Sequence, residues 1–316
     1  MIDDWKKNIP LNVRLRVFIR EWCTKNVYNP YQIFRRKNGW ADRDLFQHIK
    51  IQTNYRCTRR CSFCHYGLDT PPKNVEMDDA LYYKIIDQLK ALSYRGRISL
   101  YETNEPLTDK RLPNFLRYAR ENIPKAWLFI TTNGDLLKEG DIESLFADGL
   151  NYMYLNSYDK NAHSRNINLL NNLSKQLRKN MKHIDRTYQA SWTSRAGNVK
   201  QFHKKTLYNP CDMAYLVFYI KPNGRAYSCI NDFFNVNEMG DLNKQTILEV
   251  WFGDTFKNLR RELSRGNRNC SALCAQCDYV GYTNLPKVSL SMSVRRFLYR
   301  NYTSQGIHLK KRGWVN

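Results

Sequence analysis

The sequence predicts an α/β protein built on a parallel sheet, and three observations support this fold class. From residue 48 onward, short apolar stretches of strand character alternate with amphipathic helical stretches, which is typical of parallel strands joined by crossover helices. The 316 residues, 42% of them hydrophobic, are enough for one large core with a small satellite. Polar and cysteine-rich stretches directly follow the predicted strands, where the carboxyl ends of a parallel sheet place functional residues.

The predicted elements alternate in order along the chain. The stretch 48–54 has strand character and leads into a cysteine loop, and 77–92 has an acidic start followed by apolar residues at helical spacing. Further strands are predicted at 97–102, 126–134 and 150–159, and further helices at 109–123 and 140–149. A fifth strand is expected within 183–198, with its end carrying Arg195 and Asn198. A solvated connection is the alternative for this stretch.

A boundary is expected near residues 200–210, because a different pattern follows it. Residues 213–229 predict a hairpin around Pro222, Asn223 and Gly224, and 246–263 predict one amphipathic helix. The predicted organisation has four parts: a basic N-terminal segment packing on the core at 1–47, the main α/β domain at 48–205, a small cysteine-rich domain at 206–282 and a basic tail at 283–316.

The net charge of +22 favours anionic partners: nucleic acid, phosphorylated substrates, an acidic membrane face or an acidic redox protein. A solvated basic surface is the alternative. Residues 11–25 predict an amphipathic helix that packs on the body of the protein. No apolar run is long enough to span a membrane, and the first residues do not resemble a secretory signal, so a cytoplasmic protein is expected.

The nine cysteines point to metal binding. They are clustered and odd in number, which argues against a complete set of disulfides in a cytoplasmic protein. Cys23 stands alone on the amphipathic segment and is expected to be an ordinary buried thiol.

Cys57, Cys61 and Cys64 form a C-x3-C-x2-C pattern with no local fourth ligand. A structural zinc site normally has four protein ligands, and His65 is poorly placed to fold back as one. A four-iron cluster held by three thiolates instead keeps one iron open for another ligand. An open coordination position is what a catalytic metal site requires. Structural zinc or an inert cluster remains the alternative.

This pattern, with the aromatic Phe63 before its last cysteine, resembles the radical S-adenosylmethionine (radical SAM) superfamily. The resemblance implies a [4Fe-4S] cluster bound by the three cysteines, with S-adenosyl-L-methionine chelating the open iron. It also implies a radical SAM enzyme that reductively cleaves this cofactor to a 5′-deoxyadenosyl radical, which abstracts hydrogen from a substrate. The fold that it implies is a partial, open parallel β/α barrel.

The resemblance extends to later strand ends. The stretch Thr103–Pro106 resembles the family's Gly-Gly-Glu-Pro element, with both glycines replaced, and implies that Glu105 holds the cofactor's amino group. The other cofactor-binding residues that it implies are Asn133 in a TTNG stretch, Ser157 and Asp159 in an NSYD stretch, Phe63, and Arg195 after the fifth strand.

Cys211, Cys229, Cys274 and Cys277 form a second set, and Gly224 precedes Cys229 by five positions. This arrangement resembles the SPASM/twitch extension of radical SAM enzymes in its shortened form, which implies one auxiliary [4Fe-4S] cluster with four cysteine ligands. Cys270 competes with Cys274 as a ligand, and a zinc ribbon is the alternative site. Four protein ligands would favour an electron-transfer role.

The function expected from these features is oxidation or epimerisation of a polar sugar-type or nucleotide-linked small molecule. A peptide-modifying radical SAM enzyme is the first alternative, and a metal-stabilised nucleic-acid-binding protein is the second. The partners expected are the substrate and an electron donor such as flavodoxin or ferredoxin, which are commonly acidic.

Overall fold

One eight-stranded sheet organises the part of the chain that the structure describes. The computed structural model describes residues 45–69, 75–187, 194–202, 206–207, 211 and 213–279, all within the unit Leu45–Gly281. The predicted helix at 11–25, Cys23 and the basic tail at 283–316 lie outside the described residues, as does nearly all of the N-terminal segment at 1–47.

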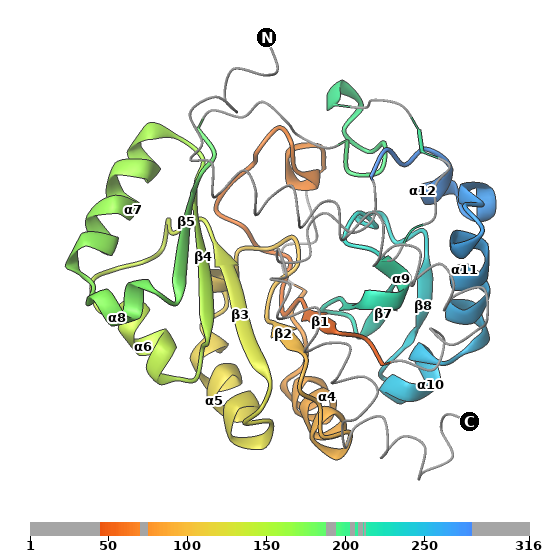
Figure 1. The fold of residues 1–316 in the computed structure, drawn as a ribbon, viewed down its shortest axis with the longest axis horizontal. Coiled ribbons are helices and arrows are strands. Elements are labelled where there is room, and N and C mark those ends of the chain that lie inside the picture. Colours follow the sequence, from red (N-terminus) through yellow and green to blue (C-terminus); the bar gives the residue numbers. More distant parts are fainter. Residues whose placement is uncertain are drawn as a thin grey trace, which may run out of the picture. The chain divides into compact units, whose positions relative to one another are not determined.

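The strands follow the order β5-β4-β3-β2-β1-β6-β7-β8 (Figure 1). Their bounds are β1 His48–Ile51, β2 Arg97–Ser99, β3 Trp127–Thr132, β4 Tyr152–Ser157, β5 Met181–Asp185, β6 Val217–Ile220, β7 Arg225–Tyr227 and β8 Glu238–Asp241. All neighbouring strands from β5 to β6 pair in parallel. The pairs β6–β7 and β7–β8 are antiparallel, so β7 alone runs against the other strands of the sheet. The predicted α/β class with an open, mostly parallel sheet is confirmed, because β5 and β8 stand at its two edges.

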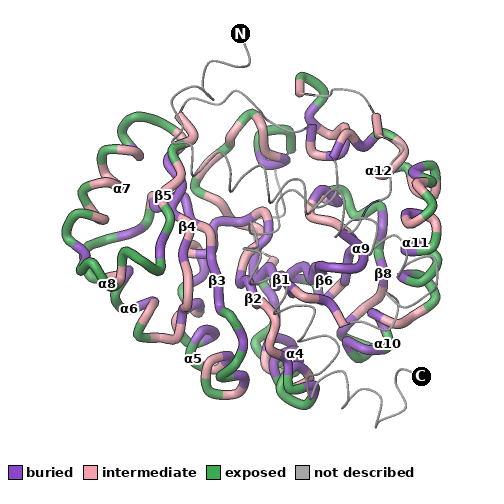
Figure 2. The backbone as a smooth tube through the Cα atoms, viewed as in Figure 1, coloured by how far each residue is buried: buried purple, intermediate pink, exposed green. Residues whose placement is uncertain are grey.

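Helices connect the parallel strands. Their bounds are α4 Asp79–Ala91, α5 Leu112–Asn122, α6 Asp141–Ala147, α7 Lys160–Asn172 and α8 Lys175–Arg178. In α4, the Asp78 side chain caps the first turn by accepting from two backbone N–H groups, and the buried Tyr82 ring stacks on Phe115 of α5 at 4.0 Å. Figure 2 shows the strands buried and the helices exposed on their outer sides.

The sequence analysis did not predict α7, and the structure shows the reason. Its buried residues are Ala162 and Asn166, so the helix carries no row of large apolar side chains at helical spacing. Its start is fixed by Asp159, whose carboxylate accepts a hydrogen bond from the backbone N–H of Ala162 at 2.8 Å.

The C-terminal part continues the same sheet. The predicted hairpin is present as β6 and β7, and β6 pairs with β1 from His48↔Val217 onward. The domain boundary expected near residue 206 stays a prediction, and the strands on its two sides share one sheet. The remaining helical elements are α9 Met213–Leu216, α10 Ile247–Trp251, α11 Asp254–Ser264, α12 Ala272–Ala275, and the short 3-10 turns His65–Gly67, Pro106–Thr108, Lys200–Phe202 and Arg268–Cys270.

The prediction of one continuous helix at 246–263 is wrong, because the structure has two helices there, α10 and α11. Thr246 and Glu249 form a capping box at the start of α10. The break falls at Gly253, where a Cβ would lie 2.7 Å from the Glu249 carbonyl oxygen, so a side chain does not fit there. In the described residues, no helix has the length and apolar character that crossing a membrane would require.

Candidate functional site

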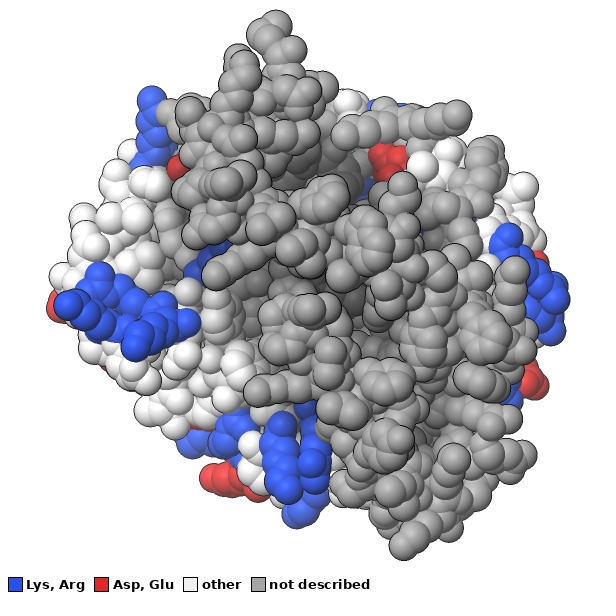
Figure 3. All heavy atoms as spheres, viewed as in Figure 1, with Lys and Arg blue, Asp and Glu red and all other residues white. Residues whose placement is uncertain are grey.

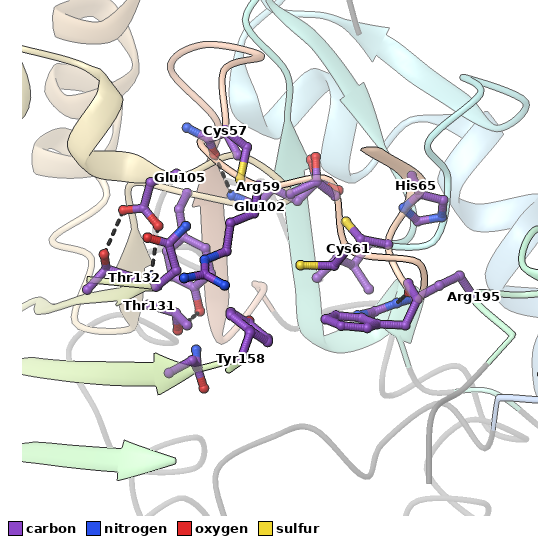
Figure 4. A pocket seen from close by; sticks show the side chains of 18 residues that line it. Cys57, Arg59, Cys61, His65, Glu102, Glu105, Thr131, Thr132, Tyr158 and Arg195 are labelled. Atoms are coloured by element: carbon purple, nitrogen blue, oxygen red, sulfur yellow. Dashed lines mark hydrogen bonds between the residues drawn. The ribbon is translucent and has the colours of Figure 1, made fainter. Parts of the chain in front are cut away.

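A pocket lies at the carboxyl ends of the parallel strands, where the sequence predicted the functional edge. The loops that follow β1, β2, β3 and β4 all contribute to its wall, and Arg195 and Ile230 approach from later in the chain. Figure 4 shows these side chains gathered around one cavity, with Cys57 and Cys61 on the loop after β1 and Glu102 and Glu105 on the loop after β2.

The three cysteines of the first pattern all line this pocket. Cys57, Cys61 and Cys64 are partly exposed, and the backbone N–H of Cys64 donates to the carbonyl of Cys61 at 2.9 Å. Gly67 keeps the turn tight, since a Cβ there would lie 2.3 Å from the Cys61 carbonyl oxygen. Burial raises the pKa of both Cys57 and Cys61 to about 11, so these thiols need a positively charged ligand such as iron to become thiolates at neutral pH.

Arginine 59 fixes the cysteine loop to the neighbouring strand ends. Its Nε and NH2 groups donate to the two carboxylate oxygens of Asp135 at 2.6 and 2.7 Å, and its NH1 donates to Asp159 at 2.6 Å. Asp135 also accepts from Arg165 at 2.7 Å and from the Thr58 hydroxyl at 3.1 Å. Burial works against ionisation of Asp135, but these hydrogen bonds, led by that from Arg59, hold its pKa below the usual range.

Glu105 is a buried, fixed acceptor on the pocket wall. Its carboxylate accepts from the Thr132 hydroxyl at 2.7 Å and from the backbone N–H groups of Asn133 and Leu107 at 2.8 and 3.2 Å. Burial raises the pKa of Glu105 to about 7, although the three hydrogen bonds act in the opposite direction. Because the carboxylate is oriented in advance, it is suited to accept an ammonium group.

The two residues that replace the family's glycines have partners of their own. The Thr103 hydroxyl donates to the Gln52 side chain at 3.2 Å, and the Asn104 amide donates to the Asn54 side chain at 3.3 Å. Both side chains therefore connect the loop after β2 to the loop after β1. Glu105, the residue that follows them, lines the pocket although both glycines are replaced.

The structure separates the remaining predicted cofactor-binding residues into two groups. Phe63, Asn133 and Arg195 line the pocket, where the Phe63 ring stacks on Tyr158 at 5.5 Å and the Arg195 Nε lies 3.4 Å from the Phe63 carbonyl. Ser157 is buried outside the pocket lining, with its hydroxyl 2.7 Å from His183 Nε2, and Asp159 lies outside the lining as the cap of α7 and partner of Arg59.

The thiols of the second set converge in space although they are far apart in sequence. Burial raises the pKa of Cys229 well above its usual range, and the nearby thiols of Cys211, Cys277 and Cys274 raise it further. Backbone N–H groups donate to the Sγ atoms of Cys229 and Cys277 at 3.4 and 3.3 Å. Such donors stabilise cluster-bound thiolates. Cys270 lies beside Cys274, and burial followed by the Cys274 thiol raises its pKa to about 11.

Both donor sets suit iron–sulfur clusters. In the described residues, no three Cys, His, Asp or Glu side chains are close enough together to ligate a single metal ion. A four-iron cluster carries its ligands on separate irons at the corners of a cube, so it accepts more widely spaced thiols than a single ion does. The first set, three thiols beside an open pocket, fits a cluster with one iron left open. The second set, four thiols together, fits a cluster in which the protein binds every iron.

The family comparison identifies the class of protein. A model of the radical SAM superfamily matches residues 51–182, and a model of the SPASM iron–sulfur cluster-binding domain matches residues 211–278. The chain belongs to the radical SAM superfamily, in its SPASM/twitch subgroup, and is an iron–sulfur oxidoreductase. Its cofactors are a [4Fe-4S] cluster with S-adenosyl-L-methionine and an auxiliary iron–sulfur centre.

The chain is similar to a dehydrogenase of known substrate and to the protein BtrN, whose structures are solved. The S-adenosyl-L-methionine-dependent 2-deoxy-scyllo-inosamine dehydrogenase of Niallia circulans is 29% identical over 239 residues, which cover 75% of this chain and 94% of that protein. The crystal structure of BtrN in complex with AdoMet and 2-DOIA is 28% identical, with a TM-score of 0.69 over 75% of this chain and 94% of that one. An open conformation of BtrN matches over the same shares, with 28% identity and a TM-score of 0.59.

Sequence reasoning missed two features of the site. The ion pair of Arg59 with Asp135 joins residues that are 76 positions apart, so no local pattern reveals it. The second is Glu102, which lines the pocket and lies three positions before Glu105. The sequence signal that could have revealed it is a second acidic residue beside the Thr103–Pro106 motif.

Proposed function

We propose that this enzyme oxidises a hydroxyl-bearing carbon of a small cyclitol- or sugar-type substrate. The observation that carries the proposal is one pocket lined by three thiols and Glu105, in a chain that also brings a second set of four thiols together. The 29% identity to a 2-deoxy-scyllo-inosamine dehydrogenase supports the substrate class.

The residues of the pocket have distinct proposed roles. Cys57, Cys61 and Cys64 hold the open cluster, and Glu105 accepts the ammonium group of S-adenosylmethionine. With S-adenosylmethionine bound, this cluster supplies the 5′-deoxyadenosyl radical that removes a hydrogen atom from the substrate. Phe63 and Tyr158 form an aromatic wall, which excludes water from that side of the pocket.

Further cofactor contacts are proposed from Asn133 and Arg195, since both line the pocket. Ser157 and Asp159 also remain predicted cofactor-binding residues. Their hydrogen bonds to His183 and to Arg59, respectively, also position the ends of β4 and of the cysteine loop.

For the auxiliary site we propose one [4Fe-4S] cluster held by Cys211, Cys229, Cys274 and Cys277. A cluster with four protein ligands would have no open iron for substrate. It would supply an acceptor for the one electron that the substrate radical loses, together with a proton to solvent, when the hydroxyl-bearing carbon becomes a carbonyl. Cys270, whose thiol lies near that of Cys274, is then a neighbouring thiol and not a ligand, because Cys274 and Cys277 form the C-x2-C pair.

The enzyme also needs an electron donor, and we propose an acidic flavodoxin- or ferredoxin-type protein in the cytoplasm. The net charge of +22 would attract such a donor. Figure 3 shows Lys and Arg side chains at several places around the rim of the described surface, with fewer acidic side chains in view. Reduction of the enzyme should therefore slow as ionic strength rises; a rate that ignores salt argues against this partner.

The experiment that tests the function is anaerobic reconstitution followed by turnover. Two four-iron clusters correspond to about eight irons per chain. With dithionite and S-adenosylmethionine, the enzyme should release 5′-deoxyadenosine, and 2-deoxy-scyllo-inosamine as a probe should increase the yield. A variant with Cys57, Cys61 and Cys64 all changed to Ala serves as the control and should release none. Zinc in place of iron, or no cleavage, would overturn the proposal.

A further inference from the structure

Glu102 holds a buried carboxylate with unsatisfied hydrogen-bonding capacity at the wall of the pocket. The residue is only 6% exposed, and neither of its carboxylate oxygens has a hydrogen-bond partner in the described part of the chain. Its side chain lines the pocket on the loop after β2, next to the cysteine loop (Figure 4). A buried carboxylate without a donor costs free energy, so its position at a pocket wall points to a binding role.

The neighbours of Glu102 are charged but do not satisfy it. The charges of Lys221, Lys50 and Asp232 act on its pKa. The Lys221 ammonium already donates to the Asp232 and Phe233 carbonyls at 2.5 and 3.2 Å, and to the Asn235 side chain at 2.6 Å. These three bonds use all of its N–H groups.

Lys50 lies on β1, opposite Ser99 of β2, and is 8% exposed. Its Nζ lies 4.8 Å from the centre of the Tyr101 ring and 6.0 Å from that of Tyr219. It influences Glu102 through charge, although no ion pair joins the two among the described residues. The charge of Lys50 therefore favours the ionised form of Glu102, against the effect of burial on its pKa.

We propose that Glu102 binds a hydroxyl group of the substrate by accepting its hydrogen bond, an inference that rests on the proposed oxidation of a cyclitol- or sugar-type molecule. Lys50, Lys221 and Arg195 already supply three positive charges near this point, against the negative charges of Glu102 and Asp232. The Asp232 carboxylate is occupied by the backbone N–H groups of Val236 and Asn237, both at 2.7 Å.

A neutral hydroxyl fits this balance better than an ammonium group does. It satisfies the free carboxylate without adding a fourth cation. The subsite is therefore specific for the hydroxyl groups of a polyol. The amino group of an aminocyclitol would lie elsewhere in the pocket.

Binding measured without turnover tests this inference. The reconstituted enzyme, with S-adenosylmethionine and no reductant, is titrated calorimetrically with scyllo-inositol and with 2-deoxy-scyllo-inosamine. The variants are E102A and E102Q. The control is E238Q, because Glu238 lies on β8 and forms an exposed ion pair with Arg225. We expect E102A to weaken binding of both probes about 10- to 100-fold, and E102Q to weaken it less because its amide oxygen still accepts.

Two readouts separate binding from a purely structural role. Without probe, E102Q should unfold at the same temperature as the wild type at pH 5 and up to about 6–12 °C above it at pH 8, because an unpaired buried carboxylate is removed. Binding to the wild type should strengthen as the pH rises through about 7, where Glu102 ionises among Lys50, Lys221 and Asp232; E102Q should lack this dependence.

The outcomes are distinct. Unchanged probe affinity in E102A, loss of binding only for the amine-bearing probe, or no binding of either probe to the wild type would each overturn the hydroxyl assignment. A wild-type enzyme that binds the probes but never forms 5′-deoxyadenosine would overturn the proposed function and leave the Glu102 assignment standing.

Discussion

Replacing Asp135 with Asn (D135N) should loosen the cysteine loop, because Asp135 is the acceptor that holds Arg59. The change keeps the size of the side chain but removes the charge and one of the two oxygens that Arg59 contacts at 2.6 and 2.7 Å. The two side chains are 20% and 17% exposed, so the pair is less screened than a surface ion pair and less desolvated than a buried one.

The magnitude follows from this intermediate exposure. Exposed pairs contribute about 0.2–1 kcal/mol, and breaking a fully buried pair costs about 3–5 kcal/mol. We therefore expect D135N to lower the free energy of unfolding by about 2 kcal/mol, which corresponds to a fall of about 4–8 °C in the unfolding temperature of a domain of this size. The reconstituted variant should also retain less iron after desalting, since Arg59 stands between Cys57 and Cys61.

The matched control is E238Q, which breaks the ion pair with Arg225, where both side chains are about twice as exposed, at 43% and 38%. It should change the unfolding temperature by less than about 2–4 °C and leave the iron content unchanged. If D135N and E238Q unfold at the same temperature and hold the same iron, the loop does not depend on Arg59 and the reasoning fails.

Three further predictions concern the pocket and the auxiliary site. E105Q should weaken S-adenosylmethionine binding about 10- to 100-fold in equilibrium dialysis, because the charged acceptor for the ammonium group is lost; unchanged affinity would remove Glu105 from the cofactor site. C270S should keep about eight irons per chain and C274S about four, and the reverse result would make Cys270 the ligand. Folding raises the pKa of Glu102 from 4.5 to about 7, so between these pH values the folded protein binds a proton that the unfolded chain has lost. The stability of the wild type should therefore fall by up to about 3 kcal/mol as the pH rises through this range. Denaturant titrations should show that E102Q is more stable than the wild type at pH 8 but not at pH 5, and an equal gain at both pH values would contradict this.

The local parts of the design were predictable from the sequence because they depend on short-range spacing. Cys57, Cys61 and Cys64 lie within one loop, and their spacing alone indicated a cluster with an open position. Short strand-like stretches alternating with helical ones predicted the fold class. The fifth strand was misplaced, since β5 ends at Asp185 and not near Arg195, and α7 escaped prediction because its buried face holds Ala162 and Asn166. The break at Gly253 also escaped, since the apolar pattern runs across it.

The sequence by itself determined the class of chemistry, because ligand type and spacing within one loop fix which metal centre can form. Only the tertiary structure decided which distant groups meet. It placed the thiols of Cys211, Cys274 and Cys277 near Cys229, and it joined Arg59 to Asp135. It also left the Glu102 carboxylate buried and without a hydrogen-bond donor in the described residues. Whether a buried charge has a partner depends on contacts between strand ends that are distant in sequence, and no local pattern records those contacts.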